Sequence, residues 1–283
     1  MLPAVLCIPE LDIALDGATT GVWPPGAVMQ RWVDHAGRLV ATGGRLRGSW
    51  WMHWRGLATF WFQEEGAVRA EPARTALESE LRDIYVRGVV PVVMLARGFE
   101  GLHASALFEP DGIVGLCASS GTGKSTIALA LASAGAGHFA DDTLIYRVAA
   151  DRPIAARLPF PVRVEPSAWQ ALSSTASALT SSLDTAVPAP LEAPIHRIYH
   201  LVRDEQLSPQ RPAFIAVPVA RRFELLLTHA HPFDMGDEDR RRAFVEHLMA
   251  VARHVEVWEC RFAPDLAALP HLAESLRGHA AKV

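Results

Sequence analysis

The stretch Ala118-Ser119-Ser120-Gly121-Thr122-Gly123-Lys124-Ser125-Thr126 decides the fold of this chain. An apolar run, Ile113 to Cys117, leads into it and predicts a short buried strand, while Ile127 to Ala134 predicts a helix that leaves it. A strand, a glycine-rich turn and a Lys-Ser pair at a helix start are the pattern of a phosphate-binding loop. A chance Gly-Lys-Ser in a surface loop is the alternative, and the flanking strand and helix argue against it.

The residue types of this stretch suit phosphate binding. Gly121 and Gly123 allow the backbone to curl so that successive N–H groups face phosphate oxygens. Lys124 can reach the outer phosphates, and the Ser125 hydroxyl can bind Mg²⁺. The first position of the usual pattern is Ala118 rather than glycine, which keeps a small residue there. The residues expected to hold the nucleotide are Ser119, Ser120, Gly121, Thr122, Gly123, Lys124, Ser125 and Thr126.

The composition bounds the class of protein. The chain has 283 residues, half of them apolar, which is enough for one large domain or two small ones. A net charge of −4 gives no general attraction to nucleic acid or to an anionic membrane, so neither is expected as a partner. Three scattered cysteines and the lack of a basic, apolar leader favour a reducing cytoplasm.

The first hundred residues predict a small β-rich region. Residues 38–42, 48–54 and 58–62 have the composition of strands, broken at Gly43-Gly44 and at Arg55-Gly56. Two interpretations remain open for the tryptophans of this region: they fill the core of a small sheet, or they line a groove that docks a peptide. These tryptophans are Trp50, Trp51, Trp54 and Trp61.

Two helices should connect this region to the rest of the chain. Residues 72–87 carry apolar residues at helical spacing, and residues 89–97 form an apolar run that ends at Gly98. We therefore expect a β-rich N-terminal region with two linking helices over residues 1–98 and a catalytic domain over residues 99–283.

A histidine is expected beside the mouth of the loop. Residues 101–108 predict a strand, and the turn Glu109-Pro110-Asp111-Gly112 joins it to the loop strand as a hairpin. If Glu109 lies opposite Gly112, then His103 lies opposite Ala118; if the turn is one residue longer, Ala104 does, and His103 is beside the loop in either register. A packed structural histidine is the alternative to a functional one.

A pair of carboxylates is also expected beside the phosphate-binding loop. The helix after Lys124 carries the chain away by roughly 16 Å, and a strand of five residues brings it back by about the same length. That strand ends at Asp141 and Asp142, next to Lys124 and Ser125. Neighbouring residues on a strand face opposite sides, so one carboxylate should face the acceptor and the other the Mg²⁺.

The strand with His103, the loop and the Asp-Asp pair only 17 and 18 positions after Lys124 resemble the catalytic domain of HPr kinase/phosphorylase and its relatives. That domain is similar to phosphoenolpyruvate carboxykinase, and the resemblance covers residues 99 to 265. It implies an α/β P-loop kinase domain with a mixed sheet and flanking helices, and it implies ATP and Mg²⁺ as cofactors. It also implies that Asp141 is the general base, that Asp142 and Ser125 serve Mg²⁺, and that His103 and Lys124 are catalytic.

The remainder of the chain departs from that family. Its long glycine-rich signature after the acidic pair is absent here. Glu165 lies roughly where the family has a metal-site glutamate, and residues 166–193 have the composition of a mobile flap over the substrate. Arg197, on an expected strand over residues 194–201, is a candidate substrate contact, with a solvated arginine as the alternative. Arg240-Arg241-Arg242 is interpreted as a solvated helix face, with contact to an acidic partner as the alternative.

These observations predict a kinase that transfers the γ-phosphoryl group of ATP to a serine or threonine hydroxyl of a peptide or small protein. Small relatives without the signature include kinases that act on the C-terminal serine of lasso-peptide precursors, so such a peptide is the expected acceptor. A kinase of free serine or another small metabolite is one alternative. A nucleotide-binding regulator with slow ATPase activity is another, and a homo-oligomer is compatible with all three.

Overall fold

The computed structural model describes residues 9–14, 28–34, 36–158 and 189–280. The chain divides into two compact units: Met1–Glu100 with Pro232–Phe244, and Gly101–His231 with Val245–Val283. The segment 232–244 therefore groups with the first hundred residues, which the sequence did not indicate. In the described ranges, no helix is long and apolar enough to cross a membrane.

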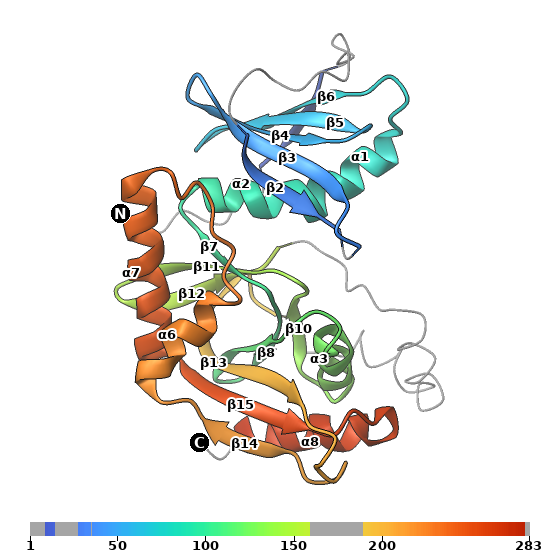
Figure 1. Ribbon diagram of the computed structural model, residues 1–283, viewed down its shortest axis with the longest axis vertical. Helices are drawn as coiled ribbons and strands as arrows, with labels where there is room; N and C mark the ends of the chain where they lie inside the picture. Colours follow the sequence, from blue (N-terminus) through green and yellow to red (C-terminus); the bar gives the residue numbers. More distant parts are fainter. Residues whose placement is uncertain (1–8, 15–27, 35, 159–188, 281–283) are drawn as a thin grey trace. The chain divides into compact units, whose positions relative to one another are not determined.

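The first unit is built on a six-stranded sheet. Its strands are β1 (Leu11–Ile13), β2 (Val28–Val33), β3 (Leu39–Leu46), β4 (Ser49–Trp54), β5 (Ala58–Phe62) and β6 (Val68–Pro72). They follow the order β1-β6-β5-β4-β3-β2, and only the β1–β6 pair is parallel (Figure 1). Tight turns at Gly48 and Gly56, where φ is +84° and +74°, close the β3–β4 and β4–β5 hairpins.

The predicted break at Gly43-Gly44 was wrong, because β3 runs through both glycines. Gly43 lies opposite Met52 of β4, and the ring of Trp32 covers it. A Cβ atom at Gly43 would lie 2.9 Å from two ring carbons of Trp32. This glycine therefore makes room for a tryptophan inside a strand and does not end the strand.

A continuous helical run packs on this sheet. It consists of α1 (Glu78–Ile84), a π-helical turn (Tyr85–Val89) and α2 (Val90–Ala96). The predicted helix start at Pro72 was wrong, because Pro72 is the last residue of β6 and pairs with Ala58. The predicted buried helix over 89–97 is confirmed, since every residue from Val90 to Leu95 is buried.

The tryptophans of β4 belong to the core of the first unit. Trp50 and Trp51 are 7% and 1% exposed, so the core interpretation is confirmed for both. Trp50 stacks on Phe62 at a centroid distance of 6.2 Å, and its indole N–H donates to Asp234 at 3.1 Å. The tight fit extends to the helical run, where the Trp54 ring lies against Gly88.

One arginine of the expected solvated triplet is part of this unit's interior. Arg240 lies in α7 (Glu238–His254) and forms a two-pronged ion pair with Glu100, with N···O distances of 2.6 and 2.7 Å. The side chain of Glu100 is fully buried. The interpretation as a solvated face was therefore wrong for Arg240, while Arg241 and Arg242 are exposed. Asp237 caps the N-terminus of α7, since its carboxylate accepts the N–H of Arg240 at 3.0 Å.

The second sheet has nine described strands. They are β7 (Glu100–Leu102), β8 (Ala104–Glu109), β9 (Gly112–Cys117), β10 (Gly137–Ala140), β11 (Leu144–Ala149), β12 (Arg152–Ala156), β13 (Glu192–Arg203), β14 (Ala213–Ala216) and β15 (Glu256–Phe262). Seven follow the order β10-β8-β9-β13-β12-β11-β7, and β15 joins β13 and β14. Strand β13 pairs in parallel with β9 and with β15, so it connects the strand of the phosphate-binding loop to the rest of the sheet.

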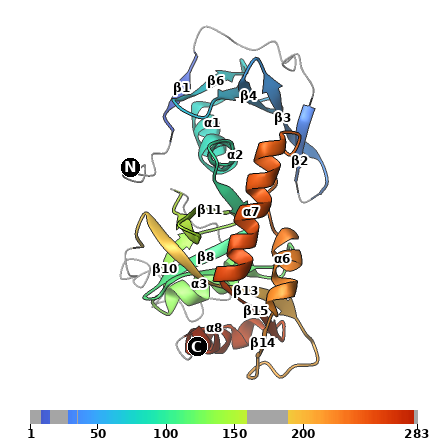
Figure 2. The same cartoon turned by 90° about the vertical axis from the view of Figure 1, so that its left-hand side faces the viewer.

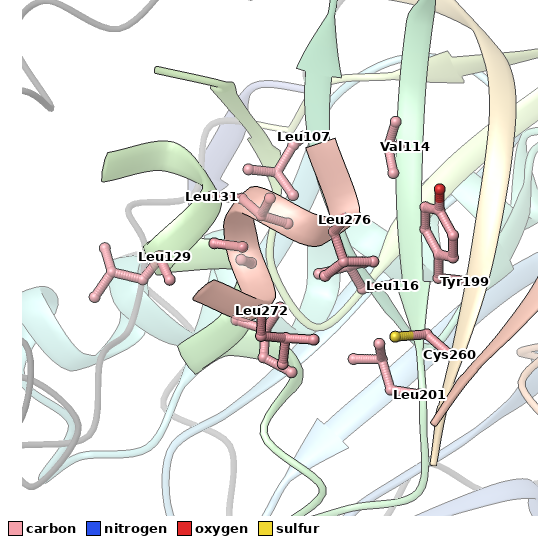
Figure 3. Close-up of a cluster of buried hydrophobic side chains, with 14 of the residues drawn as sticks. Leu107, Val114, Leu116, Leu129, Leu131, Tyr199, Leu201, Cys260, Leu272 and Leu276 are labelled. Carbon is pink, nitrogen blue, oxygen red and sulfur yellow. The ribbon is translucent and has the colours of Figure 1, made fainter. Parts of the chain in front are cut away.

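The core of the second unit lies between this sheet and two helices, α3 (Lys124–Ser133) and α8 (Leu269–Ala280), as Figure 3 shows. α3 is buried from Ile127 to Ala132, which is typical of a helix that is apolar on all sides. Leucines of α8, Leu272 and Leu276, pack against it and against Tyr199 of β13. This packing fixes the N-terminus of α3, and with it the phosphate-binding loop.

The remaining helices complete the unit. α6 (Val219–Leu227) lies beside the end of α7 (Figure 2), where Arg222 donates to the carbonyls of Val255 and Ala252 at 2.9 and 3.4 Å. These bonds satisfy acceptors that a helix end leaves open. The chain then returns from α6 to the sheet at Ala230, which forms an isolated bridge with Leu102.

Candidate active site

The phosphate-binding loop lies between β9 and α3, as the sequence predicts. Gly121 and Gly123 have φ values of +78° and +110°, in the region that glycine alone adopts without strain. The N–H of Thr122 donates to the carbonyl of Ser119 at 3.2 Å and closes a turn at the tip. Ser119, Ser120 and Gly121 are exposed, so the loop has an open side that a phosphate can reach.

Lys124 is the first residue of α3 and is only 8% exposed. Its Nζ atom donates to the carbonyl of Ala118 at 3.3 Å and lies 3.1 Å from Nε2 of His103. Burial lowers the pKa of Lys124, and the nearby charges of Asp142 and Asp141 act in the opposite direction. The amine is thus held at the base of the loop.

The hairpin that positions His103 has the predicted register. Glu109 lies opposite Gly112 and Ala104 opposite Cys117, which brings His103 across from the start of the loop. Its backbone N–H donates to the carbonyl of His229 at 2.7 Å. Its ring Nε2 lies 3.0 Å from Oδ1 of Asp142 as well as near Lys124. This nitrogen can donate to the carboxylate or accept from the amine, but it cannot do both at once.

The acidic pair also arrives where the helix-and-return geometry predicts. β10 ends at Ala140, and the two aspartates form the bend that follows it. Asp142 has a φ of +67°, a left-handed conformation that aspartate tolerates better than most residues. One bent dipeptide thus presents two carboxylates to two different groups of partners.

The partners of Asp141 include a residue that sequence reasoning missed. Oδ1 of Asp141 accepts hydrogen bonds from Ser125 at 2.8 Å and from Ser105 at 2.9 Å. Ser105 lies on β8 and is fully buried. A signal was present in the sequence, because His103 and Ser105 are two polar residues two positions apart in an apolar strand, and so share one face.

The hydrogen bonds give Asp141 and Asp142 other partners than the sequence analysis expected. Asp142 was expected beside Ser125 at the metal, but Ser125 donates to Asp141 instead. The side chain of Asp142 is 81% exposed and pairs with His103. The hydrogen bond from His103 lowers the pKa of the Asp142 carboxyl, which is therefore ionised at neutral pH. Asp141 is the carboxylate beside the expected metal hydroxyl, and Asp142 is the carboxylate that an incoming group can reach.

Further histidines lie close to His103 and to one another. The His231 ring lies 6.0 Å from the His103 ring, and the His229 ring lies 5.2 Å from the His200 ring. Burial is the main cause that lowers the pKa of His229, to about 4, and it also lowers the pKa of His231 and of His200. These rings are neutral at pH 7, and among the described residues no three or more His, Cys, Asp or Glu side chains are grouped so that they could hold a metal.

A second residue that the sequence did not indicate contacts the loop from the far end of β13. The guanidinium of Arg203 donates to the carbonyl of Gly121 at 2.7 Å and to that of Thr122 at 3.1 Å. No local pattern around Arg203 indicates this role, because the contact depends on the pairing of β13 with β9 across 80 residues of chain.

Two predicted site residues are not part of this group. Arg197 was expected to contact substrate, and this was wrong: its side chain is fully buried and bonds Glu256 at 2.6 and 2.9 Å. It lies opposite Val114 near the start of β9, whereas the loop follows the end of that strand. Glu165 and the expected flap up to residue 188 lie outside the described residues.

The donor set fits a nucleotide with Mg²⁺. Mg²⁺ binds oxygen ligands and keeps several waters, so the hydroxyl of Ser125 and the carboxylate of Asp141, together with phosphate oxygens, are suitable partners. The loop has open space beside both glycines, since a Cβ atom at Gly121 or Gly123 would meet nothing within 4 Å. Lys124 supplies the positive charge that phosphates require.

No known protein family and no curated protein matches the sequence of this chain. A solved structure, the HPr(Ser) kinase/phosphatase from Coxiella burnetii, is similar to it with 18% sequence identity and a TM-score of 0.35. The similarity covers 64% of this chain and 97% of that one. A TM-score of this size does not establish a shared fold.

Proposed function

We propose that this chain is an ATP- and Mg²⁺-dependent kinase that transfers the γ-phosphoryl group to a serine or threonine hydroxyl of a peptide or small protein. The observation that carries the proposal is the meeting of four groups: a glycine-rich loop, the buried amine of Lys124, the Ser125–Asp141 hydrogen bond, and the accessible carboxylate of Asp142. Each has a separate task in phosphoryl transfer.

The contacts support a definite set of roles. Lys124 and the loop amides hold the phosphates and stabilise the charge that develops on them. Ser125 and Asp141 would hold Mg²⁺, which when bound neutralises phosphate charge and orients the transferred group. Asp142 takes the proton of the acceptor hydroxyl, and His103 fixes the orientation of that carboxylate. This assignment exchanges the roles that the resemblance implies for the two aspartates.

In the proposed phosphoryl transfer, one phosphorus–oxygen bond forms as another breaks. The acceptor oxygen forms a bond to the γ-phosphorus while the bond between that phosphorus and the β–γ bridging oxygen breaks. The hydroxyl proton moves to Asp142, and the electron pair of the broken bond stays on ADP. The high exposure of Asp142 supports an acceptor that approaches from outside the loop, such as a chain segment.

The finer assignment concerns the acceptor. We propose a peptide with a C-terminal serine, such as a lasso-peptide precursor, on the basis of the sequence resemblance and the absent family signature. Free serine is the alternative within the same chemistry. A regulator that signals through the tryptophans is less well supported, because Trp50 and Trp51 are core residues. Free, buried thiols at Cys117 and Cys260 are compatible with the cytoplasm as the site of the reaction.

The test compares the wild-type protein with Lys124→Ala and Asp142→Asn. Each protein is incubated with Mg²⁺, γ-labelled ATP and, in separate reactions, a peptide ending in serine, the same peptide ending in alanine, and free L-serine. Label on the serine peptide with the wild type only is the expected result. Label on free serine alone would identify a metabolite kinase. ATP hydrolysis without label on any hydroxyl would contradict the kinase proposal.

A further inference from the structure

Arg203 is the last residue of β13, and its guanidinium reaches the tip of the phosphate-binding loop. The two carbonyl oxygens that it contacts, those of Gly121 and Thr122, are consecutive along the chain, at 2.7 and 3.1 Å. A guanidinium is a planar fork whose N–H groups can bond two neighbouring oxygens together. The contact therefore fixes two successive peptide units.

Fixing these oxygens also fixes the amides of the loop. The carbonyl of Gly121 shares a peptide plane with the N–H of Thr122, and the carbonyl of Thr122 shares one with the N–H of Gly123. In a trans peptide the C=O and N–H groups point in opposite directions. When Arg203 holds both oxygens on its own side, the N–H groups are turned the other way. The N–H of Thr122 then closes the turn on Ser119.

The loop needs such a restraint. Its two glycines give it the required positive φ values but also the largest backbone freedom, which a ligand would have to restrict on binding. Gly121 is exposed, and a Cβ atom built there would meet nothing within 4 Å. Arg203 is anchored on the sheet, where its backbone pairs with Phe262 of β15, so its base does not move with the loop.

We propose that Arg203 is a positioning residue that holds the loop in the conformation that binds the triphosphate, so that less ordering is required when ATP binds. The inference rests on the proposed nucleotide-binding function. The two bonds of Arg203 to the loop go to backbone oxygens, so its proposed role is to orient the amides rather than to contact the reacting atoms.

The experiment measures ATP binding and kinetics for wild type, Arg203→Gln, Arg203→Lys and the control Arg261→Gln. Arg261 lies on the neighbouring strand, opposite Val202, and its partners are Glu259 and Asp204 rather than the loop. Binding of a non-hydrolysable ATP analogue is followed by calorimetry. Thermal unfolding without nucleotide is recorded in parallel.

Arg203→Gln should raise the Kd and the KM for ATP about tenfold, which is the size of one lost charge-assisted hydrogen bond. The KM for the acceptor and the melting temperature without nucleotide should stay near the wild-type values. Arg203→Lys, which supplies one donor group without the fork, should fall between the two. Arg261→Gln should bind ATP like the wild type.

Two outcomes would overturn the inference. If Arg203→Gln binds the analogue as tightly as wild type, the arginine does not prepare the loop. If its melting temperature without nucleotide falls while its Kd is unchanged, the residue serves the stability of the sheet only. These results differ from failure of the proposed function, in which the wild-type protein itself would bind no ATP.

Discussion

Replacing Asp141 with asparagine should weaken Mg²⁺ binding while leaving the fold intact. The amide oxygen of asparagine can still accept from Ser105 and Ser125, which donate to Asp141 at 2.9 and 2.8 Å. We therefore expect the free energy of unfolding to change by no more than about 1 kcal/mol, the difference between a charged and a neutral acceptor. What the variant loses is one negative charge beside the metal hydroxyl.

The size of that loss follows from Coulomb's law. Two unit charges about 4 Å apart in water interact by about 1 kcal/mol, so a carboxylate and a divalent cation interact by about 2 kcal/mol. Two kcal/mol corresponds to a factor of about 30 in a binding constant. Because Asp141 is half-buried and less screened than a surface group, about 30-fold is a lower bound on the rise in the half-saturating Mg²⁺ concentration.

The assay is steady-state phosphoryl transfer to a serine peptide at a fixed total ATP concentration, with free Mg²⁺ varied. Asp141→Asn should recover much of its rate at high Mg²⁺. Asp142→Asn should keep the wild-type Mg²⁺ requirement and lose roughly 100-fold to 10,000-fold in kcat, as expected for a missing general base. Asp151→Asn, in the exposed turn between β11 and β12, is the matched control and should behave as wild type.

The opposite pattern would refute this reasoning. If Asp142→Asn raises the Mg²⁺ requirement and Asp141→Asn is inactive even at saturating Mg²⁺, then Asp141 is the base. The Ser125–Asp141 hydrogen bond would then be a feature of the metal-free protein only.

Three further predictions concern structure. Glu256→Gln should cost about 1–2 kcal/mol in urea unfolding, because it removes the negative charge opposite the fully buried Arg197, although the Glu256 side chain is itself 38% exposed. The KM for the acceptor should stay unchanged; a changed KM at wild-type stability would restore Arg197 as a substrate contact. Burial lowers the pKa of His229 to about 4, below its unfolded value of 6.5, so the stability that the neutral ring allows is complete above pH 6.5 and is lost as pH falls towards 4. His229→Asn should remove up to about 3 kcal/mol of this loss of stability in acid. Equal stability–pH profiles for the variant and the wild type would contradict this expectation. Gly43→Ala should cost about 1–3 kcal/mol in thermal melts, since its Cβ would lie 2.9 Å from the Trp32 ring, and an unchanged melting temperature would mean that the ring moves freely.

The features that sequence reasoning placed correctly are short-range. The hairpin register between Glu109 and Gly112 follows from the length of its turn, and the position of Asp141 follows from a helix and a strand of equal reach. Both follow from covalent geometry over at most twenty residues. His103 was found in the same way, because its distance from the turn sets its position across from the loop.

The features that it missed depend on pairings between distant segments. Arg203 reaches the loop only because β13 pairs with β9, and the burial of Arg197 depends on Glu256 from a third strand. The misplaced strand break at Gly43 has a different origin: the two strands are neighbours in the chain, and the glycine accommodates the ring of Trp32 from β2. Local propensity describes a glycine as a breaker, and tertiary packing decides otherwise.

The residues of the candidate site lie close together along the chain. His103, Ser105, the loop and both aspartates belong to one contiguous segment, residues 101–142, built from β8, β9, α3 and β10. Insertions, deletions or recombination elsewhere in the gene can therefore change the surrounding surfaces without altering any of these side chains. A laboratory library that holds residues 101–142 and Arg203 constant while it varies the other surfaces should yield variants that keep phosphoryl transfer and differ in the peptide they accept.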